Sequence, residues 1–405
     1  MARSPLTLAA SVASALPQVS VVRVGALTEG ASGRYDSAVV TLDDGRRVVV
    51  RVPVDAEADA ELRAEVHALR ALTPGVRGVV PFEAPEVVGE SSAGGAFVLV
   101  ETLLEGYRVD GPHIPAGPGV ATAIAAAIAA VHDLPHTVVR DAGLPLRTSA
   151  QIRDDAERLL DRAEATGRLP FGLLRRWSQA LAAEPLWRFE TTVTLGGVEP
   201  GAFLLADADG IPSVTGLLSW GGLSVGDPAV DLRWTSATPL ARDEVLSAYA
   251  TASGRALDPL VVARARLYAE LEFAKWLVHG HTVGSESIVT DAVGLLEALD
   301  ENVRDEPLLT REGVNVDDAL ALLARVPDTA AELVDTSMQT DAYDPATMSA
   351  FTTPAATDRA PHADIATSPI ELSDWSPQAP DAGADDAGAR DEAAQNALRR
   401  WTESA

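Results

Sequence analysis

The sequence predicts an α+β protein of two lobes, a small antiparallel β lobe and a larger, mainly helical lobe, followed by an acidic C-terminal tail. Three observations predict this. β-Branched runs fill much of residues 19–102, apolar residues recur at helical spacing from about residue 119, and large apolar residues become rare after Pro307. We therefore expect domains at 1–102, 103–306 and 307–405, the last mostly disordered with possible short helices.

A helix is expected near the N-terminus. Residues 1–22 carry Arg3, an apolar stretch and the letters "ASA", as a signal peptide would, but alanine and serine dilute the apolar stretch. The apolar positions instead fall at helical spacing, namely Leu6, Ala9, Ala10, Ala13 and Leu16. A surface helix leading into the first strand is the preferred interpretation.

The β lobe should consist of strands around one helix. "VVRVGAL" and "DSAVVTLDDGRRVVVRVP" contain β-branched runs, and Asp43, Asp44 and Gly45 between two of these runs predict a hairpin. In residues 59–72 the apolar positions are helical, namely Leu62, Val66, Leu69 and Leu72. "FVLVETLLEG" then predicts a buried strand that continues into a connector.

The second lobe should be built from helices around one short β segment. Helical patterns cover residues 119–135, 149–167, 171–184, 242–254 and 261–281, and short strands are expected within 194–234. Farther on, "VDDALALLARV" and "RDEAAQNALRRW" could each form a short helix in the tail.

The composition limits the classes of function. The formal charge is −27, and from Pro327 onward 15 acidic residues stand against four arginines, so a nucleic-acid partner is not expected. An amine-bearing cation would be tolerated better, although a solvated acidic surface explains the charge equally well. Without cysteine there is no disulfide or thiolate chemistry, and no run is long enough for a membrane span, so we expect a cytoplasmic protein.

Several segments, in this order, resemble the aminoglycoside and macrolide phosphotransferases, whose fold is protein-kinase-like. "VVVRVP" looks like the third strand of the small lobe, and "ELRAEVHALRAL" looks like the helix whose glutamate pairs with that strand. "AAAIAAVHDLP", "PLWRFETTVTLGG" and "VGDPAVDLRW" resemble later family segments. The resemblance covers about residues 5–305, and it implies ATP-dependent phosphorylation of a small molecule's hydroxyl group.

The residues that would carry this chemistry are missing. The family pattern H-G-D-x-x-x-x-N supplies a catalytic Asp and a metal-binding Asn, and a later Asp holds the metal ions on the phosphates. Aligned with this sequence, the His position is Leu195, the catalytic Asp position is Gly197 and the Asn position is Ala202. The later Asp position is Ser219. A Mg²⁺ site is therefore doubtful, and no metal site is predicted.

The residues that shape the family's catalytic segment are kept, namely Gly196, Pro200, Gly201, Trp220, Gly226, Asp227, Pro228 and Asp231. By resemblance, Asp231 braces the catalytic loop. Glu199 is a possible substitute for the missing base, because it lies two residues from Gly197. Asp207 and Asp209 are better explained as residues of a hairpin turn.

ATP or another nucleotide remains a possible ligand. Gly30 and Gly33 stand in the position of the loop that covers the phosphates, although a plain hairpin turn explains them equally well. Arg51 stands where most kinases have the phosphate-binding lysine, and Glu65 is placed on the next helix to pair with it. The alternative is an Arg51 side chain that points to solvent.

The remaining ionisable residues are assigned structural roles. His132, His136, His279 and His281 are expected at helix ends, where they would bond to carbonyl groups. Glu270, Glu272 and Lys275 are expected on a solvated helix face, although the resemblance implies that a late helix could contribute acidic groups to the substrate cleft.

The leading hypothesis is a pseudo-phosphotransferase that acts by binding a small molecule or a protein. The alternative is an active ATP-dependent phosphotransferase that uses relocated groups such as Glu199. A third possibility is an adaptor whose site is filled by bulky side chains, for which Leu195 and Phe203 are candidates.

Overall fold

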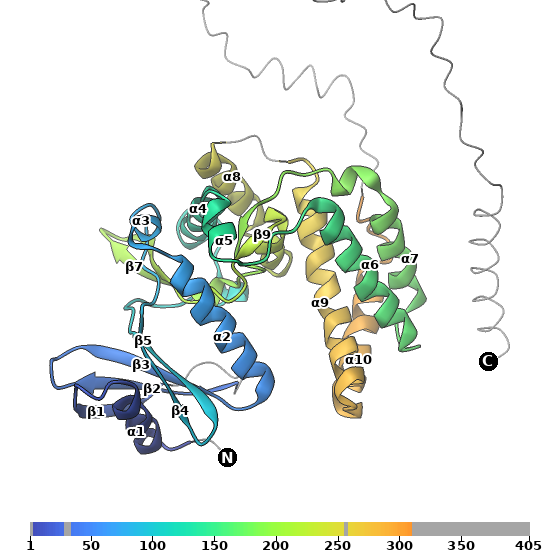
Figure 1. The fold of residues 1–405 in the computed structure, drawn as a ribbon. Coiled ribbons are helices and arrows are strands. Elements are labelled where there is room, and N and C mark those ends of the chain that lie inside the picture. The colour runs from blue at the N-terminus through green and yellow to red at the C-terminus, as the bar shows by residue number, and fades with distance from the viewer. Residues whose placement is uncertain (1–2, 28–33, 255–257, 310–405) are drawn as a thin grey trace, which may run out of the picture. The chain divides into compact units, whose positions relative to one another are not determined.

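The computed structural model describes residues 3–27, 34–254 and 258–309, which form a β lobe and a helical lobe (Figure 1). The expected glycine loop with Gly30 and Gly33 lies outside the described residues, and so does the tail with its two possible helices. The elements of the β lobe are α1 (Pro5–Ala15), β1 (Val21–Ala26), β2 (Tyr35–Leu42), β3 (Arg47–Pro53), α2 (Ala56–Ala71), α3 (Pro74–Arg77), β4 (Val87–Ala93) and β5 (Ala96–Thr102).

The β lobe contains one five-stranded antiparallel sheet with the strand order β1-β2-β3-β5-β4. The predicted hairpin joins β2 to β3, and Gly45 in its turn has a φ of +86°. A positive φ is favourable only for glycine and a few polar residues, so the "DDG" signal correctly identified the turn.

The alternation of side chains along β3 separates the two faces of the sheet. Val48, Val50 and Val52 belong to an apolar cluster with α1, whereas Val49 and Arg51 face the opposite side. Strand β5 pairs with β3 and continues the same division. This alternation directs the charged Arg51 toward α2 and the helical lobe.

The predicted N-terminal helix is confirmed as α1, but its buried face is not the expected one. Ser4 caps its first turn by accepting a hydrogen bond from the Thr7 N–H. Leu8, Ser11 and Val12 are buried against the sheet, whereas Leu6 is 76% exposed. Alanine-rich helices have weak amphipathic patterns, so the sheet rather than the sequence determines which face is covered.

Helix α2 covers the other side of the sheet. Asp55 caps it by accepting a 2.8 Å hydrogen bond from the Ala58 N–H. The predicted apolar stripe is confirmed, with Leu62 and Val66 packed against Phe97 and Leu99 of β5 and with Leu69 in the core of the helical lobe. Glu65 lies on the same face of the helix and is buried.

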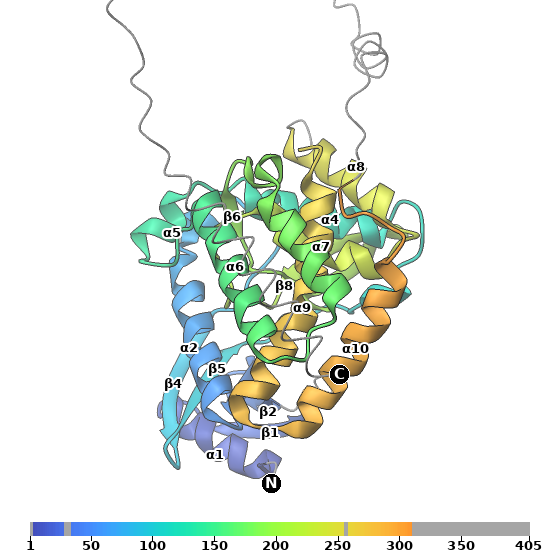
Figure 2. The same ribbon diagram turned by 90° about the vertical axis from the view of Figure 1, so that its right-hand side faces the viewer.

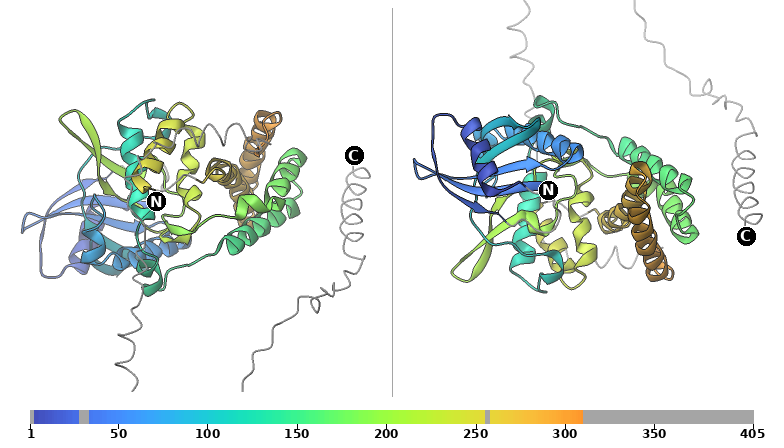
Figure 3. Two further views of the ribbon diagram at one scale, coloured as in Figure 1. Left: turned by 90° about the horizontal axis from the view of Figure 1, so that it is seen from above. Right: turned by 90° about the horizontal axis from the view of Figure 1, so that it is seen from below.

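The helical lobe packs its helices around the short strands (Figures 2 and 3). It holds two apolar clusters. Its helices are α4 (Val120–His132), α5 (Thr137–Asp141), α6 (Ser149–Ala165), α7 (Phe171–Ala182), α8 (Arg242–Ser253), α9 (Val261–Val283) and α10 (Glu286–Val303). The described residues also form 3₁₀ helices, namely η1 (Gly111–His113), η2 (Glu184–Trp187), η3 (Pro200–Ala202) and the longer η4 (Pro228–Ala237). One cluster is centred on α4, α8 and η4, and the other joins α6, α7, α9 and α10.

Helix α10 was not identified from the sequence. Its buried positions recur at helical spacing, namely Val289, Ala292, Leu296 and Val303. Among the described helices, none combines the length and the apolar character required to cross a bilayer.

The short strands expected within 194–234 are β6 (Thr192–Thr194), β7 (Phe203–Ala208), β8 (Ile211–Leu217) and β9 (Ser224–Gly226). Strands β7 and β8 form a hairpin, and Asp209 and Gly210 in its turn both have positive φ values. Asp207 accepts a 2.6 Å hydrogen bond from the hydroxyl group of Tyr107. The turn interpretation of "ADADG" is therefore confirmed for Asp209, whereas Asp207 lies in β7 and not in the turn.

Candidate functional site

A cleft of about 930 Å³ lies between the sheet and the segment 195–222. Val49, Arg51, Glu65 and Glu101 line it from the β lobe. From the helical lobe it is lined by residues 195–199 and by Ser219. The structure thus brings most of the described candidate residues to one cleft. Phe203 lies in the core and does not line the cleft, so it does not fill the site as the adaptor hypothesis expected.

Arg51 does not point to solvent. Its Nη1 donates a 2.8 Å hydrogen bond to Glu65, and its side chain is only 13% exposed. A second carboxylate, Glu101, lies 3.6 Å away, and the guanidinium lies over the ring of Tyr35 at 4.4 Å. Burial raises the pKa of Tyr35 to about 12, although the charge of Arg51 acts in the opposite direction. The cleft therefore contains a strand-to-helix ion pair of the kind that positions nucleotide phosphates in kinases.

Asp231 shapes the loop in which catalysis would occur. This fully buried carboxylate accepts hydrogen bonds from the backbone N–H groups of Leu195 and Gly197, each at 2.6 Å, and of Val198 at 3.2 Å. Because three donors converge on one carboxylate, the loop is held in a single backbone arrangement.

His132 supports this carboxylate and corrects a prediction. Its Nε2 lies 3.0 Å from Asp231 Oδ2, and its Nδ1 lies 2.8 Å from the hydroxyl group of Tyr249. It is buried and contacts side chains, not the helix-end carbonyl groups that were expected. His136, in contrast, lies 3.0 Å from the carbonyl oxygen of Thr191.

The backbone at the base position strongly favours glycine. Gly196 and Gly197 have φ values of +75° and +100°. A Cβ atom at Gly197 would lie 2.3 Å from Nη1 and 2.6 Å from Cζ of Arg233. The guanidinium of Arg233 therefore occupies the space into which a catalytic carboxylate at residue 197 would extend.

Two carboxylates hold Arg233 in this position. Its Nη2 and Nε donate hydrogen bonds of 3.0 and 3.2 Å to Oε1 of Glu199, and its Nη1 donates a 2.8 Å bond to Glu272. The Arg233 side chain is 15% exposed, whereas that of Glu199 is 60% exposed. The sequence analysis did not identify Arg233, because an arginine two residues after Asp231 gives no signal of its own.

In this arrangement Glu199, the proposed substitute base, is already engaged by Arg233. Oε1 of Glu199 already accepts two hydrogen bonds from one guanidinium. A cation in this position also replaces the negative charge that accepts a proton in the family's reaction.

The metal-binding positions do not fit Mg²⁺. Ala202 has no oxygen in its side chain, and Ser219 offers one neutral hydroxyl group at the exposed edge of the cleft. Mg²⁺ prefers carboxylate and phosphate oxygens. Within the part of the chain that the structure describes, no three His, Asp or Glu side chains are arranged to hold a metal ion.

Trp220 and Asp227 have structural contacts. Trp220 is fully buried and donates a 2.8 Å hydrogen bond to the carbonyl oxygen of Leu217. Asp227 caps η4 and pairs with the buried Arg264 at 2.7 Å. The hydroxyl group of Tyr268 also donates to Asp227, and burial together with this charge raises the pKa of Tyr268 well above its usual value.

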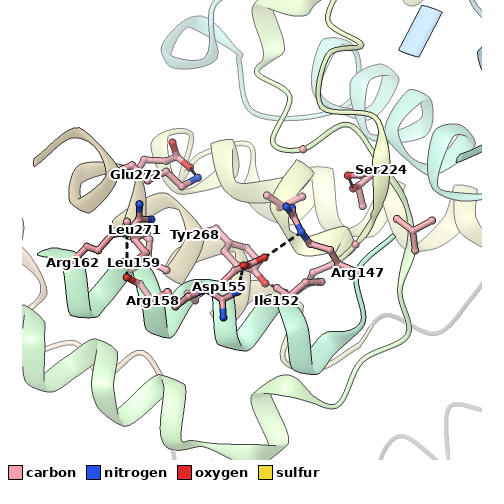
Figure 4. Close-up of a pocket in the computed structure, with 18 of the residues that line it drawn as sticks. Arg147, Ile152, Asp155, Arg158, Leu159, Arg162, Ser224, Tyr268, Leu271 and Glu272 are labelled. Atoms are coloured by element: carbon pink, nitrogen blue, oxygen red, sulfur yellow. Dashed lines mark hydrogen bonds and ion pairs between the residues drawn. The ribbon is translucent and has the colours of Figure 1, made fainter. Parts of the chain in front are cut away.

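A second cavity of about 850 Å³ lies in the helical lobe (Figure 4), and Glu272 and Lys275 are among the residues that line it. It is formed by α6, α9 and the ends of β6 and β9, and it reaches Gly196 of the loop. Asp155 is paired with Arg147 at 3.2 Å and also with Arg158. On the opposite wall, Glu272 is paired with Lys275 at 2.6 Å.

Glu270 was wrongly expected on a solvated helix face. It is 3% exposed and accepts two hydrogen bonds from Arg176, of 2.8 and 2.9 Å, and one from the indole N–H of Trp177. It joins α9 to α7 and has no place in either cavity.

Comparisons with known proteins place this geometry in context. Residues 26–272 match the family model of the phosphotransferase enzyme family. No protein of curated function matched the chain. Among solved structures, a macrolide 2′-phosphotransferase type I is 23% identical with a TM-score of 0.58, and the match covers 73% of this chain and 98% of that chain.

Two further structures are similar in the same way. The macrolide 2′-phosphotransferase from Brachybacterium faecium is 20% identical with a TM-score of 0.58, over 70% of this chain and 96% of that chain. The GDP complex of aminoglycoside 2′-phosphotransferase-IIIa is 18% identical with a TM-score of 0.61, over 74% and 99%. These similarities confirm the predicted bilobal, kinase-like fold.

Proposed function

The chain belongs to the phosphotransferase enzyme family, and we propose that it is a pseudo-phosphotransferase, which binds its ligands without transferring a phosphoryl group. One observation carries the proposal: the guanidinium of Arg233 lies in the space that a base at Gly197 would occupy. A cation held there by two carboxylates cannot accept a proton from a substrate hydroxyl group.

The expected loss of rate is large. Removing a positioned base typically slows a reaction by about 10²–10⁴-fold. The neutral side chains of Ala202 and Ser219 also forfeit the metal ions that neutralise the migrating phosphoryl group, which is the largest catalytic contribution in this chemistry. Together these losses bring the rate close to the uncatalysed background.

A nucleotide is the ligand that the interlobe cleft supports best. The cleft is open, and the ion pair between Arg51 and Glu65 is intact at 2.8 Å. In kinases the corresponding basic residue contacts the phosphates while paired with the glutamate. A structure of one relative in this family contains GDP. We therefore propose binding of ATP or GTP that does not require Mg²⁺.

The test combines a binding measurement with a turnover measurement on the full chain. A ligand at a hundredfold excess over its Kd stabilises the folded state by about 2.7 kcal/mol, which a thermal-shift assay detects. We expect ATP or GTP to raise the melting temperature equally with Mg²⁺ and with EDTA. Arg51→Met should abolish the shift. Arg47→Met, an exposed arginine on the same strand paired only with Glu105 among described residues, should leave it unchanged.

Turnover is measured with aminoglycoside- and macrolide-like compounds as acceptors, by nucleotide hydrolysis and by the mass of the acceptor. We expect no phosphorylated acceptor. A product that depends on Mg²⁺ and disappears in Glu199→Gln would overturn the proposal in favour of an active phosphotransferase with a relocated base.

Restoring the family residues provides a sharper test of the role of Arg233. The triple variant Gly197→Asp, Ala202→Asn and Ser219→Asp should stay inactive, because the new carboxylate would be strained at a φ of +100° and paired with the guanidinium. Adding Arg233→Ala removes the competing cation. Activity in the triple variant without this fourth change would contradict the assigned role of Arg233.

A further inference from the structure

The helical-lobe cavity combines an apolar floor with a cationic rim. Ile152 and Leu159 of α6 and Leu271 of α9 line its interior (Figure 4). Its volume of about 850 Å³ lies within the range of small-molecule sites. A molecule with an apolar body can therefore be buried between the two helices.

Four cationic side chains line this cavity in a chain whose formal charge is −27. Arg147 precedes α6, Arg158 and Arg162 lie on α6, and Lys275 lies across from them on α9. The cations therefore come from several elements and face a common space. The acidity of the whole chain does not extend to this cavity, because salt screens charges beyond about 8–10 Å.

The carboxylates of the cavity are largely committed to partners. Asp155 is shared by two arginines, Arg147 and Arg158, which leaves one unit of positive charge uncompensated. Glu272 accepts hydrogen bonds from Lys275 and from Arg233 outside the cavity. A cationic ligand would have to break these pairs before it gained a carboxylate.

The remaining two carboxylates do not change this conclusion. Asp227 is buried and paired with Arg264. Asp161 is exposed and opposes the positive excess in part. Arg162 adds a further cation, whose hydrogen bond within the described residues goes to the neutral carbonyl oxygen of Arg158 at 3.3 Å.

We infer that this cavity binds a small organic anion, with an apolar body over Ile152, Leu159 and Leu271 and a carboxylate or phosphate group held by Arg158, Arg162 and Lys275. Arginine forms paired hydrogen bonds with both kinds of anion. The inference rests on the proposed binding function and adds the chemical class of the ligand. It reverses the expectation, drawn from the acidic composition, that an amine would be the better tolerated ligand.

Three probes with one ring system test the inference by calorimetric titration of the full chain. They are naphthalene-2-carboxylate, 2-naphthyl phosphate and 2-naphthylmethylamine. Both anions should bind, with an affinity that falls as salt is added, and the amine should not. The tighter of the two anions identifies the head group. Equal or tighter binding of the amine would overturn the inference.

Variants assign the binding to this cavity. The double variant Arg158→Gln/Arg162→Gln should weaken anion binding about tenfold or more, because hydrogen bonds from charged donors are lost. Arg153→Gln is the matched control, since Arg153 lies on the same helix, does not line the cavity and pairs with Glu157. Unchanged affinity in the double variant would refute the site.

A second variant and the composition of the titration make the result interpretable. If the double variant unfolds, Lys275→Gln on the opposite helix tests the same prediction, since it should also weaken binding of the anions. The titration contains no nucleotide or acceptor, so its result does not depend on turnover. A phosphorylated product would overturn the pseudo-phosphotransferase proposal alone, and amine binding would overturn the anion inference alone.

Discussion

Replacing Gly197 by alanine should destabilise the protein by more than its backbone conformation explains. At a φ of +100°, a residue with a Cβ atom costs about 1–3 kcal/mol of folding free energy. The new Cβ would also lie 2.3 Å from Nη1 of Arg233, so the guanidinium must move and release Glu199 and Glu272. Both carboxylates are partly exposed, so the lost pairs add about 1 kcal/mol together.

Gly117 is a control that separates the cost of displacing Arg233 from the backbone cost. Its φ is +94°, close to that of Gly197, and a Cβ atom there would meet nothing within 4 Å. Gly117→Ala should therefore lose only the backbone cost. The difference between the two alanine variants, measured by urea denaturation at constant m, should be about 1 kcal/mol.

A double-mutant cycle assigns that difference to Arg233. In an Arg233→Ala background, Gly197→Ala should cost only the backbone contribution, which gives a coupling energy of about 1 kcal/mol. Equal losses at Gly117 and Gly197, with a coupling energy inside an error of about 0.3 kcal/mol, would refute the packing of the guanidinium on the loop.

Three further predictions concern groups around the site. Arg51→Met should lower the free energy of unfolding by about 3 kcal/mol in a denaturant titration, because it removes the cation beside the buried Glu65. The pKa of Tyr35 is raised to about 12, so its contribution to the free energy of unfolding is complete below pH 10 and is lost as the pH rises through 12. Tyr35→Phe should therefore reduce the loss of stability between pH 10 and 12. An unchanged slope of unfolding free energy against pH would contradict this prediction. Glu270→Gln should lower the free energy of unfolding, measured by urea denaturation, by about 3 kcal/mol, because it removes the carboxylate that pairs with Arg176, whose side chain is 10% exposed. A loss below about 1 kcal/mol would show that this ion pair is dispensable.

Local patterns made much of the fold predictable. The period of two in "VVVRVP" separates the valines that pack under α1 from Arg51, and the helical period of α2 places Glu65 on the buried face. Since both periods follow from backbone geometry, the ion pair between these residues could be expected before its 2.8 Å distance was known. The turn at Gly45 was predictable for the same reason, because few residues other than glycine favour its φ of +86°.

The contacts that define the candidate site were not predictable in this way. Arg233 lies 34 residues from Glu199 and 39 from Glu272, so no local period relates them. His132 reaches Asp231 across 99 residues. Such pairs depend on how whole elements pack, and a single sequence gives the types of the residues but not their tertiary partners. Helix α10 is a different case, since its buried positions recur at helical spacing and the sequence pattern was sufficient to predict it.

Arg233 links the two proposals electrostatically. Its guanidinium pairs with Glu199, which lines the interlobe cleft, and with Glu272, which lines the helical-lobe cavity. A phosphotransferase needs negative charge at this point, to accept a proton and to hold metal ions. Here one cation pairs with a carboxylate on each side of the loop. The same charge that disables proton transfer also removes a carboxylate that would repel an anion from the second cavity. Arg233→Ala should therefore weaken binding of naphthalene-2-carboxylate in the same calorimetric titration, because Lys275 alone would then compensate the charge of Glu272. Unchanged or tighter binding would show that the two roles of Arg233 are separate.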